Sequence, residues 1–129
     1  EDQLYVSTSV RSSVGSRKED LCDRLVYLSE FLGAEVDLVG DYPAWEYQKE
    51  SKIRGKVADT WKQLFGEEPA FEAIHAGLEC GLLSEKISGL DAVAFGPDIL
   101  DIHTPKEHLS LSSAKRVYEF LTTLLKNMK

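Results

Sequence analysis

The sequence has 129 residues, 43% hydrophobic and 29% charged, which is typical of one globular domain or of two adjoining parts of a larger one. The net charge is −7 and no run of basic residues exceeds two, so we expect no nucleic acid partner, because nucleic acid backbones bind clustered Lys and Arg. No apolar stretch approaches the roughly 20 residues that cross a bilayer, and two cysteines are too few for a disulfide framework, so we expect a cytoplasmic protein without a membrane partner.

The first third of the chain predicts a strand, a helix and a second strand. Residues 3–10 alternate apolar and polar side chains, the period of a half-buried strand, and because the alternation starts at once we expect a piece of a longer protein. A capping-box pattern, Ser16 with Glu19, opens a helix whose leucines recur at helical spacing until Gly33 ends it. Residues 34–40 suit a short strand.

The rest of the chain predicts a connection, followed by helices that alternate with short apolar runs. Residues 41–51, "DYPAWEYQKES", break the periodicity and suit a connection between two packed units. Helices are predicted at 51–66, 78–87 and 114–129, and nearly all-apolar runs lie at 70–75 and 91–96. Such runs suit strands buried on both faces of a mainly parallel sheet, so we predict an α/β fold in which helices pack on one edge of a sheet.

The first candidate site is the loop "DIHTPKEHLS", residues 101–110. A proline biases the residue before it away from helix, so His103 sits in irregular backbone beyond a predicted strand, where α/β sheets place ligands. Its imidazole could bind a metal, with Asp101 or a backbone carbonyl orienting the other ring nitrogen. The alternative is a solvated histidine, because no partner ligand lies at a recognisable spacing. We expect Glu107 to serve the N-terminus of the final helix.

Two further residues could bind a carboxylate. Gly77 stands between a predicted strand and a helix, where free backbone N–H groups and the helix dipole attract anions. The alternative is that Gly77 only permits a tight turn and Gly81 only permits close packing. Arg11 ends the first predicted strand and could clamp a carboxylate with its planar guanidinium, or be an ordinary surface arginine.

Four stretches together are similar to a known family. "VRSSVGSRKEDL", "DYPAWEY", "IHAGLECGLL" and "FGPDILDIHTPKEHLSLSS" resemble, in this order, the C-terminal part of the aminoacyl-histidine (Xaa-His) dipeptidases of the M20 metallopeptidase family. The resemblance implies a cytoplasmic zinc metallopeptidase that hydrolyses Xaa-His dipeptides such as carnosine-type substrates through a zinc-activated water. It also implies a two-zinc catalytic α/β domain interrupted by an α+β lid domain. Residues 1–45 would be the C-terminal part of the lid (dimerisation-type) domain, and residues 46–129 the C-terminal part of the catalytic domain.

The resemblance also implies roles for three residues. His103 matches the last metal ligand, a histidine on one of the two zinc ions, and the backbone of Gly77 matches the position that binds the C-terminal carboxylate of the dipeptide. Arg11 matches a lid arginine that grips the same carboxylate. In the family the H-x-D motif and the catalytic glutamate pair lie in the N-terminal half, and none of the three histidines here is followed by x-Asp, since they read "HAG", "HTP" and "HLS". We therefore assign no catalytic residue and expect the segment alone to be inactive, with its zinc absent or incomplete.

The implied partners are the dipeptide substrate and the N-terminal half of the same enzyme, and the resemblance also allows a homodimer. Two alternatives stay open. One is another M20-type amidohydrolase, such as a tripeptidase, an aminoacylase or a carboxypeptidase. The other is a non-catalytic module for carboxylate binding or assembly.

Overall fold

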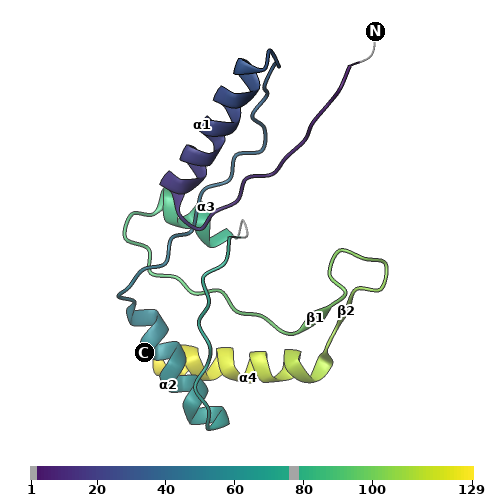
Figure 1. Cartoon of the computed structure of the whole chain (residues 1–129). Coiled ribbons are helices and arrows are strands. Elements are labelled where there is room, and N and C mark those ends of the chain that lie inside the picture. Colours follow the sequence, from purple (N-terminus) through teal and green to yellow (C-terminus); the bar gives the residue numbers. More distant parts are fainter. Residues whose placement is uncertain (1–2, 76–78) are drawn as a thin grey trace. The chain divides into compact units, whose positions relative to one another are not determined.

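The computed structural model describes residues 3–75 and 79–129 (Figure 1). Over these residues the chain forms helices and one two-stranded sheet, and no described helix is both long enough and apolar enough to cross a membrane. The elements are α1 (Gly15–Phe31), α2 (Lys52–Phe65), α3 (Glu79–Lys86), β1 (Ile99–Leu100), β2 (His108–Leu109) and α4 (Leu111–Asn127). All four predicted helices are thus confirmed, within a few residues of their expected bounds.

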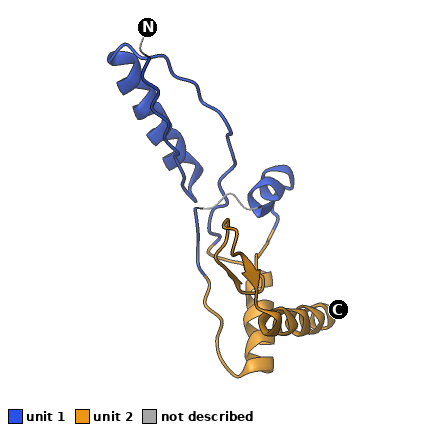
Figure 2. Ribbon diagram, turned by 90° about the vertical axis from the view of Figure 1, so that its right-hand side faces the viewer, with its two compact units in different colours: residues 1–48, 72–90 blue, residues 49–71, 91–129 orange. Residues whose placement is uncertain are grey.

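The chain divides into two compact units, each built from two separate stretches (Figure 2). Unit 1 comprises Glu1–Gln48 and Glu72–Leu90 and contains α1 and α3. Unit 2 comprises Lys49–Phe71 and Asp91–Lys129 and contains α2, the two strands and α4. The assignment of the first 45 residues to a lid and of the remainder to a catalytic domain stays a prediction.

The buried core of unit 2 lies where α2 packs against α4. Its centre is Phe120, which is 1% exposed and has the rings of Trp61 and Phe95 edge-on at centroid distances of 5.3 and 5.0 Å. Val57 and Leu124 are the other buried apolar side chains of this cluster. The apolar residues that α2 repeats at helical spacing therefore form its inner face, as the sequence predicts. These residues are Ile53, Val57, Trp61 and Leu64.

Both ends of α2 are capped. Ser51 Oγ accepts a hydrogen bond from the N–H of Arg54 at 3.0 Å, and Gly66 ends the helix in the left-handed conformation with φ 75°. Asp91 adds a cap that the sequence does not reveal. Its carboxylate accepts from Ser51 Oγ at 2.6 Å and from the next two backbone N–H groups at 2.7 and 3.0 Å. The hydrogen bond from Ser51, followed by the backbone bonds, lowers the pKa of Asp91.

The start of α1 in unit 1 differs from the predicted capping box. The helix begins at Gly15, and its N-cap residue makes no side-chain hydrogen bond. The N–H of Gly15 instead donates to Oε1 of Glu46 at 2.9 Å. The capping box of Ser16 and Glu19 is therefore wrong, because a carboxylate from the distant connection supplies the acceptor at the helix start.

The predicted connection packs closely against both helices of unit 1. The Lys18 ammonium of α1 donates hydrogen bonds to the Asp41 carboxylate and to the Tyr42 carbonyl, both at 2.6 Å. The hydrogen bond between Lys18 and Asp41 lowers the pKa of the Asp41 carboxyl group. On α3, Gly81 is buried so close to the connection that a Cβ atom there would lie 2.9 Å from the Pro43 carbonyl oxygen. The alternative in which Gly81 permits close packing is confirmed.

The predicted strands differ most from the structure. The described residues form one sheet, the antiparallel pair β1–β2, and the segments 3–10, 34–40, 70–75 and 91–96 are not strands. A strand needs a neighbour for its backbone N–H and C=O groups, and none of these segments pairs with another described segment. Their apolar side chains include Leu4, which is 89% exposed, and Val39, which is 88% exposed. Helices and a small sheet are both present, but the expected parallel sheet is not formed by these segments.

Candidate functional site

The hairpin of β1 and β2 carries His103 in its loop, residues 101–107 (Figure 1). The strand partners are Ile99 with Leu109 and Leu100 with His108. Two hydrogen bonds fasten the base of the hairpin to the start of α4. The N–H of Asp98 donates to Ser113 Oγ at 2.9 Å, and the N–H of Ser110 donates to the Asp98 carbonyl at 3.0 Å. The loop is therefore presented from a fixed base rather than from a free linker.

The backbone of this loop takes an unusual conformation. Asp101 and His103 have φ values of 53° and 65°, a left-handed region that residues other than glycine rarely adopt. Hydrogen bonds within the loop hold this conformation. Thr104 donates to the Asp101 carbonyl through its N–H at 3.1 Å and through Oγ1 at 2.7 Å. The N–H of His103 donates to Oε2 of Glu107 at 2.8 Å.

Two details of this loop differ from the sequence prediction. Glu107 does not serve the N-terminus of α4, which Ser110 caps, and its carboxylate instead turns back to the His103 backbone. The prediction for Glu107 is wrong because the hairpin places it across the loop from His103. The carboxylate of Asp101 lies beside a different histidine, with Oδ2 3.7 Å from Nδ1 of His108.

The side chain of His103 is exposed, so its imidazole is accessible as a metal donor. Among residues 3–75 and 79–129, no group of three or more His, Cys, Asp or Glu side chains is placed to hold a metal ion. A zinc site in a protein generally has four ligands, of which a single imidazole supplies one. A four-ligand zinc site that includes His103 would therefore need at least two donors from outside the described residues.

The other two predicted site residues, Arg11 and Gly77, do not belong to the same described unit as His103. Arg11 belongs to unit 1, where it is exposed ahead of α1, whereas His103 belongs to unit 2. The guanidinium of Arg11 makes no hydrogen bond or ion pair with a described residue. Gly77 lies outside the described residues, and His75 is exposed in the coil that precedes that gap. The roles of His103, Gly77 and Arg11 stay predictions.

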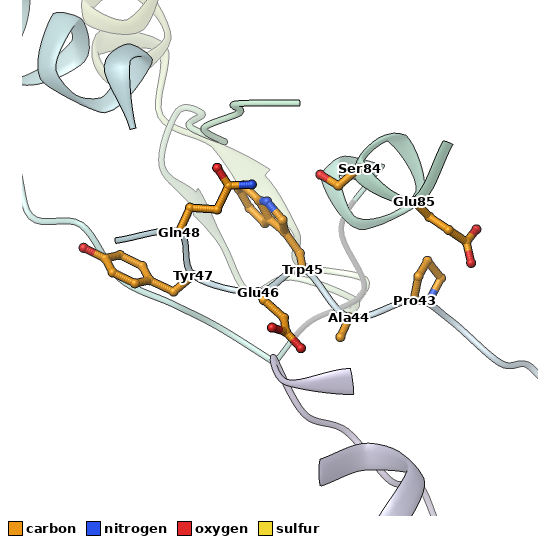
Figure 3. Close-up of a pocket in the computed structure, with 8 residues that line it drawn as sticks. All are labelled: Pro43, Ala44, Trp45, Glu46, Tyr47, Gln48, Ser84 and Glu85. Atoms are coloured by element: carbon orange, nitrogen blue, oxygen red, sulfur yellow. The ribbon is translucent and has the colours of Figure 1, made fainter. Parts of the chain in front are cut away.

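Unit 1 also has a shallow pocket that the sequence does not predict. The pocket, of about 440 Å³, lies between the connection and two residues of α3, Ser84 and Glu85 (Figure 3). Trp45 and Tyr47 supply its aromatic surface, and Ser84 Oγ is buried without a hydrogen bond to a described residue. The aromatic residues of "DYPAWEY" are the only sequence feature that could have indicated this pocket, but such residues are equally typical of a connection that packs against helices.

Comparison with known proteins relates this chain to peptidases. No family model matches the sequence. The chain is 32% identical, over 128 residues and 99% of its length, to the cytosol non-specific dipeptidase of Escherichia coli (strain K12), of which it covers 26%. The crystal structure of the aminoacylhistidine dipeptidase from Vibrio alginolyticus matches 89% of the chain with a TM-score of 0.73 and 31% identity, over 24% of that protein. The chain resembles a segment of these dipeptidases.

The predicted resemblance to a dipeptidase is thus confirmed in both sequence and structure. The dipeptidase-like segment spans about a quarter of the length of the relatives it matches. The match includes both units, because 89% of the chain cannot be covered by either one alone.

Proposed function

We propose that this chain is part of a dipeptidase and contributes to its metal site and to its binding site for the substrate carboxylate. The observation that carries the proposal is the match, at 31–32% identity over nearly the whole chain, to two proteins that are both named as dipeptidases. The proposed substrates are Xaa-His dipeptides such as carnosine-type compounds. The proposed location is the cytoplasm, as for the cytosol dipeptidase of Escherichia coli.

In this proposal His103 is one ligand of a two-zinc site. Its exposed imidazole stands on a loop that hydrogen bonds hold from both sides, which is the rigid support that a metal ligand needs. The remaining donors and the catalytic glutamates come from the N-terminal half of the same enzyme. Zinc, when bound there, supplies an activated water for peptide hydrolysis. The chain alone contains no assigned catalytic residue and is inactive in this proposal.

Arg11 and Gly77 hold the free carboxylate of the dipeptide in this proposal. Arg11 is suited to this role because its guanidinium is exposed and is not engaged by a described residue. A planar guanidinium binds a carboxylate through two parallel hydrogen bonds. Anchoring the C-terminal carboxylate places the last peptide bond of the substrate at the metals, and in a dipeptide this is the only peptide bond. Residues 1–45 then act as the lid that carries Arg11, and residues 46–129 belong to the catalytic domain.

Three single substitutions in the full-length protein test these roles. His103→Ala should lose bound zinc and dipeptidase activity, whereas His108→Ala, on the same hairpin, should keep both. Arg11→Ala should keep its zinc and raise KM by about 10- to 100-fold, the effect of losing a hydrogen-bonded charge pair. Zinc per protein chain is measured by atomic emission, and KM by steady-state hydrolysis of carnosine. Full zinc content in His103→Ala, or unchanged kinetics in Arg11→Ala, would contradict the respective role.

A substrate screen on the full-length protein tests the specificity. The Escherichia coli relative is named a non-specific dipeptidase and the Vibrio alginolyticus relative an aminoacylhistidine dipeptidase, so the screen includes dipeptides without histidine. Comparing kcat/KM for Xaa-His dipeptides, other dipeptides, tripeptides and N-acyl amino acids separates a dipeptidase from the other amidohydrolases. Zinc-independent binding of a free dipeptide to the 129-residue chain would instead support a carboxylate-binding module.

A further inference from the structure

Glu107 contacts the loop of His103 twice. Its Oε2 accepts the N–H of His103 at 2.8 Å, and its own N–H donates to the carbonyl of Thr104 at 3.1 Å. A hydrogen bond to a carboxylate is roughly twice as strong as one between neutral groups. The Glu107 side chain thus restrains the backbone of the proposed zinc ligand through the N–H of His103.

The hydrogen bond from the His103 N–H to Glu107 restrains the backbone dihedral angles of His103. The N–H of His103 belongs to the peptide plane that precedes its Cα, and Glu107 holds that plane. The following plane carries the N–H of Thr104, which is bound to the Asp101 carbonyl. With both planes held, φ and ψ of His103 are fixed, and so is the direction in which Cβ and the imidazole leave the backbone.

The left-handed conformation makes this restraint necessary. His103 has φ 65°, which an L-residue rarely adopts without a restraint from its surroundings. If the preceding peptide plane were released, His103 would relax towards negative φ and its ring would point elsewhere. Of the two restraints, the hydrogen bond from Thr104 lies between backbone groups, whereas the one from Glu107 depends on a side chain and can be removed by substitution.

We propose that Glu107 is a positioning residue for His103. The proposal rests on the proposed function, in which His103 is a zinc ligand. The Glu107 carboxylate holds the loop in its left-handed form before zinc binds, so the imidazole already points in the direction that the metal requires. Zinc binding then needs no rearrangement of the loop, and the affinity for zinc is correspondingly higher.

The test compares four variants of the full-length protein: Glu107→Ala, Glu107→Gln, His103→Ala and the control Glu119→Gln, which is exposed on α4. Zinc affinity is measured by competition with a chromogenic chelator, and the Tm of the metal-free protein by scanning calorimetry. Glu107→Ala should weaken zinc binding by about 10- to 100-fold, the usual effect of losing a group that supports a metal ligand. Glu107→Gln keeps an acceptor oxygen and should recover most of the affinity.

Two further measurements separate positioning from a purely structural role. The Tm of metal-free Glu107→Ala should stay near that of the wild type, because the loop is exposed and lies outside the core around Phe120. In an amide NMR spectrum of the metal-free protein, the proton of His103 should move upfield in Glu107→Ala and little in Glu119→Gln. This shift reports the loss of the hydrogen bond to the carboxylate without any contribution from metal or activity.

The results also separate the two proposals. Wild-type zinc affinity in Glu107→Ala, together with lost zinc in His103→Ala, would overturn the positioning role and leave the proposed zinc ligand in place. Full zinc in His103→Ala would overturn both. A fall in Tm for Glu107→Ala without rescue of zinc affinity by Glu107→Gln would assign Glu107 to hairpin stability and overturn the positioning role.

Discussion

Substitution of Phe120 by Ala tests how far the stability of unit 2 depends on its small core. Phe120 is 1% exposed and is the side chain on which α2, α4 and the segment after Asp91 converge. The rings of Trp61 and Phe95 meet it edge-on at 5.3 and 5.0 Å. Removing the ring therefore creates a cavity and eliminates both aromatic contacts at once.

The expected loss of stability is large for a protein of this size. Truncation of a buried Phe to Ala costs about 3–5 kcal/mol, and each lost edge-to-face pair accounts for about 0.5–1.5 kcal/mol beyond the area buried. With two such pairs at Phe120 we expect a value of about 4–5 kcal/mol. Most domains are stable by only about 5–15 kcal/mol, so the variant should lose a large fraction of its folding free energy.

The assay is urea unfolding followed by far-UV circular dichroism, with Tyr118→Ala as the matched control. Tyr118 lies on the same helix but is 70% exposed, so its truncation should cost less than about 0.5 kcal/mol. If Phe120→Ala destabilised the protein no more than this control, the packing of α2 against α4 would not be the core of unit 2.

Three further substitutions test local features. Asp91→Asn should lower the Tm at pH 6, because the pKa of Asp91 is lowered by its hydrogen bond from Ser51 and its carboxylate therefore stabilises the fold above its ordinary pKa of 3.8. The difference from wild type should shrink as the pH falls from 3.8 through the lowered folded-state pKa, and a constant difference in a pH series of thermal melts would contradict this assignment. Gly81→Ala places a Cβ 2.9 Å from the Pro43 carbonyl and should cost about 1–3 kcal/mol in urea unfolding, whereas a stabilised variant would show that the connection can move away. Gly66→Ala should cost about 1–2 kcal/mol because its φ of 75° is strained for alanine, although no atom blocks the new methyl group; an unchanged midpoint would indicate a different helix end.

The helices could be predicted from the sequence because the signals that start and end them are local. Ser51 and Gly66 bound α2 as their residue types suggest, and Gly33, with φ 80°, follows the last turn of α1. The start of α1 could not be predicted, since its acceptor is Glu46, 31 residues further along the chain. Asp91, which caps α2, lies 40 residues from Ser51. Contacts at such separations leave no periodic pattern in the sequence.

The strands could not be predicted reliably for a related reason. Residues 3–10 alternate apolar and polar side chains, and residues 91–96 are nearly all apolar; both patterns suit a strand. A strand forms only where a neighbouring strand pairs with it, and the sequence of a segment does not show whether such a neighbour exists. The candidate site shows the same division. His103 could be singled out by its position and by the family resemblance. The proposed role of Glu107 could not be predicted from the sequence, because it depends on the left-handed backbone conformation of His103, which no residue type in the loop indicates.

The order in which the chain builds its two units has a mechanical consequence. The backbone passes from one unit to the other three times, after residues 48, 71 and 90. The side-chain amide of Gln48 donates a hydrogen bond to the carbonyl of Leu90 at 3.3 Å. This bond joins the chain at the first passage to the chain at the third. A single proteolytic cleavage at one of these three passages would therefore leave the other two intact.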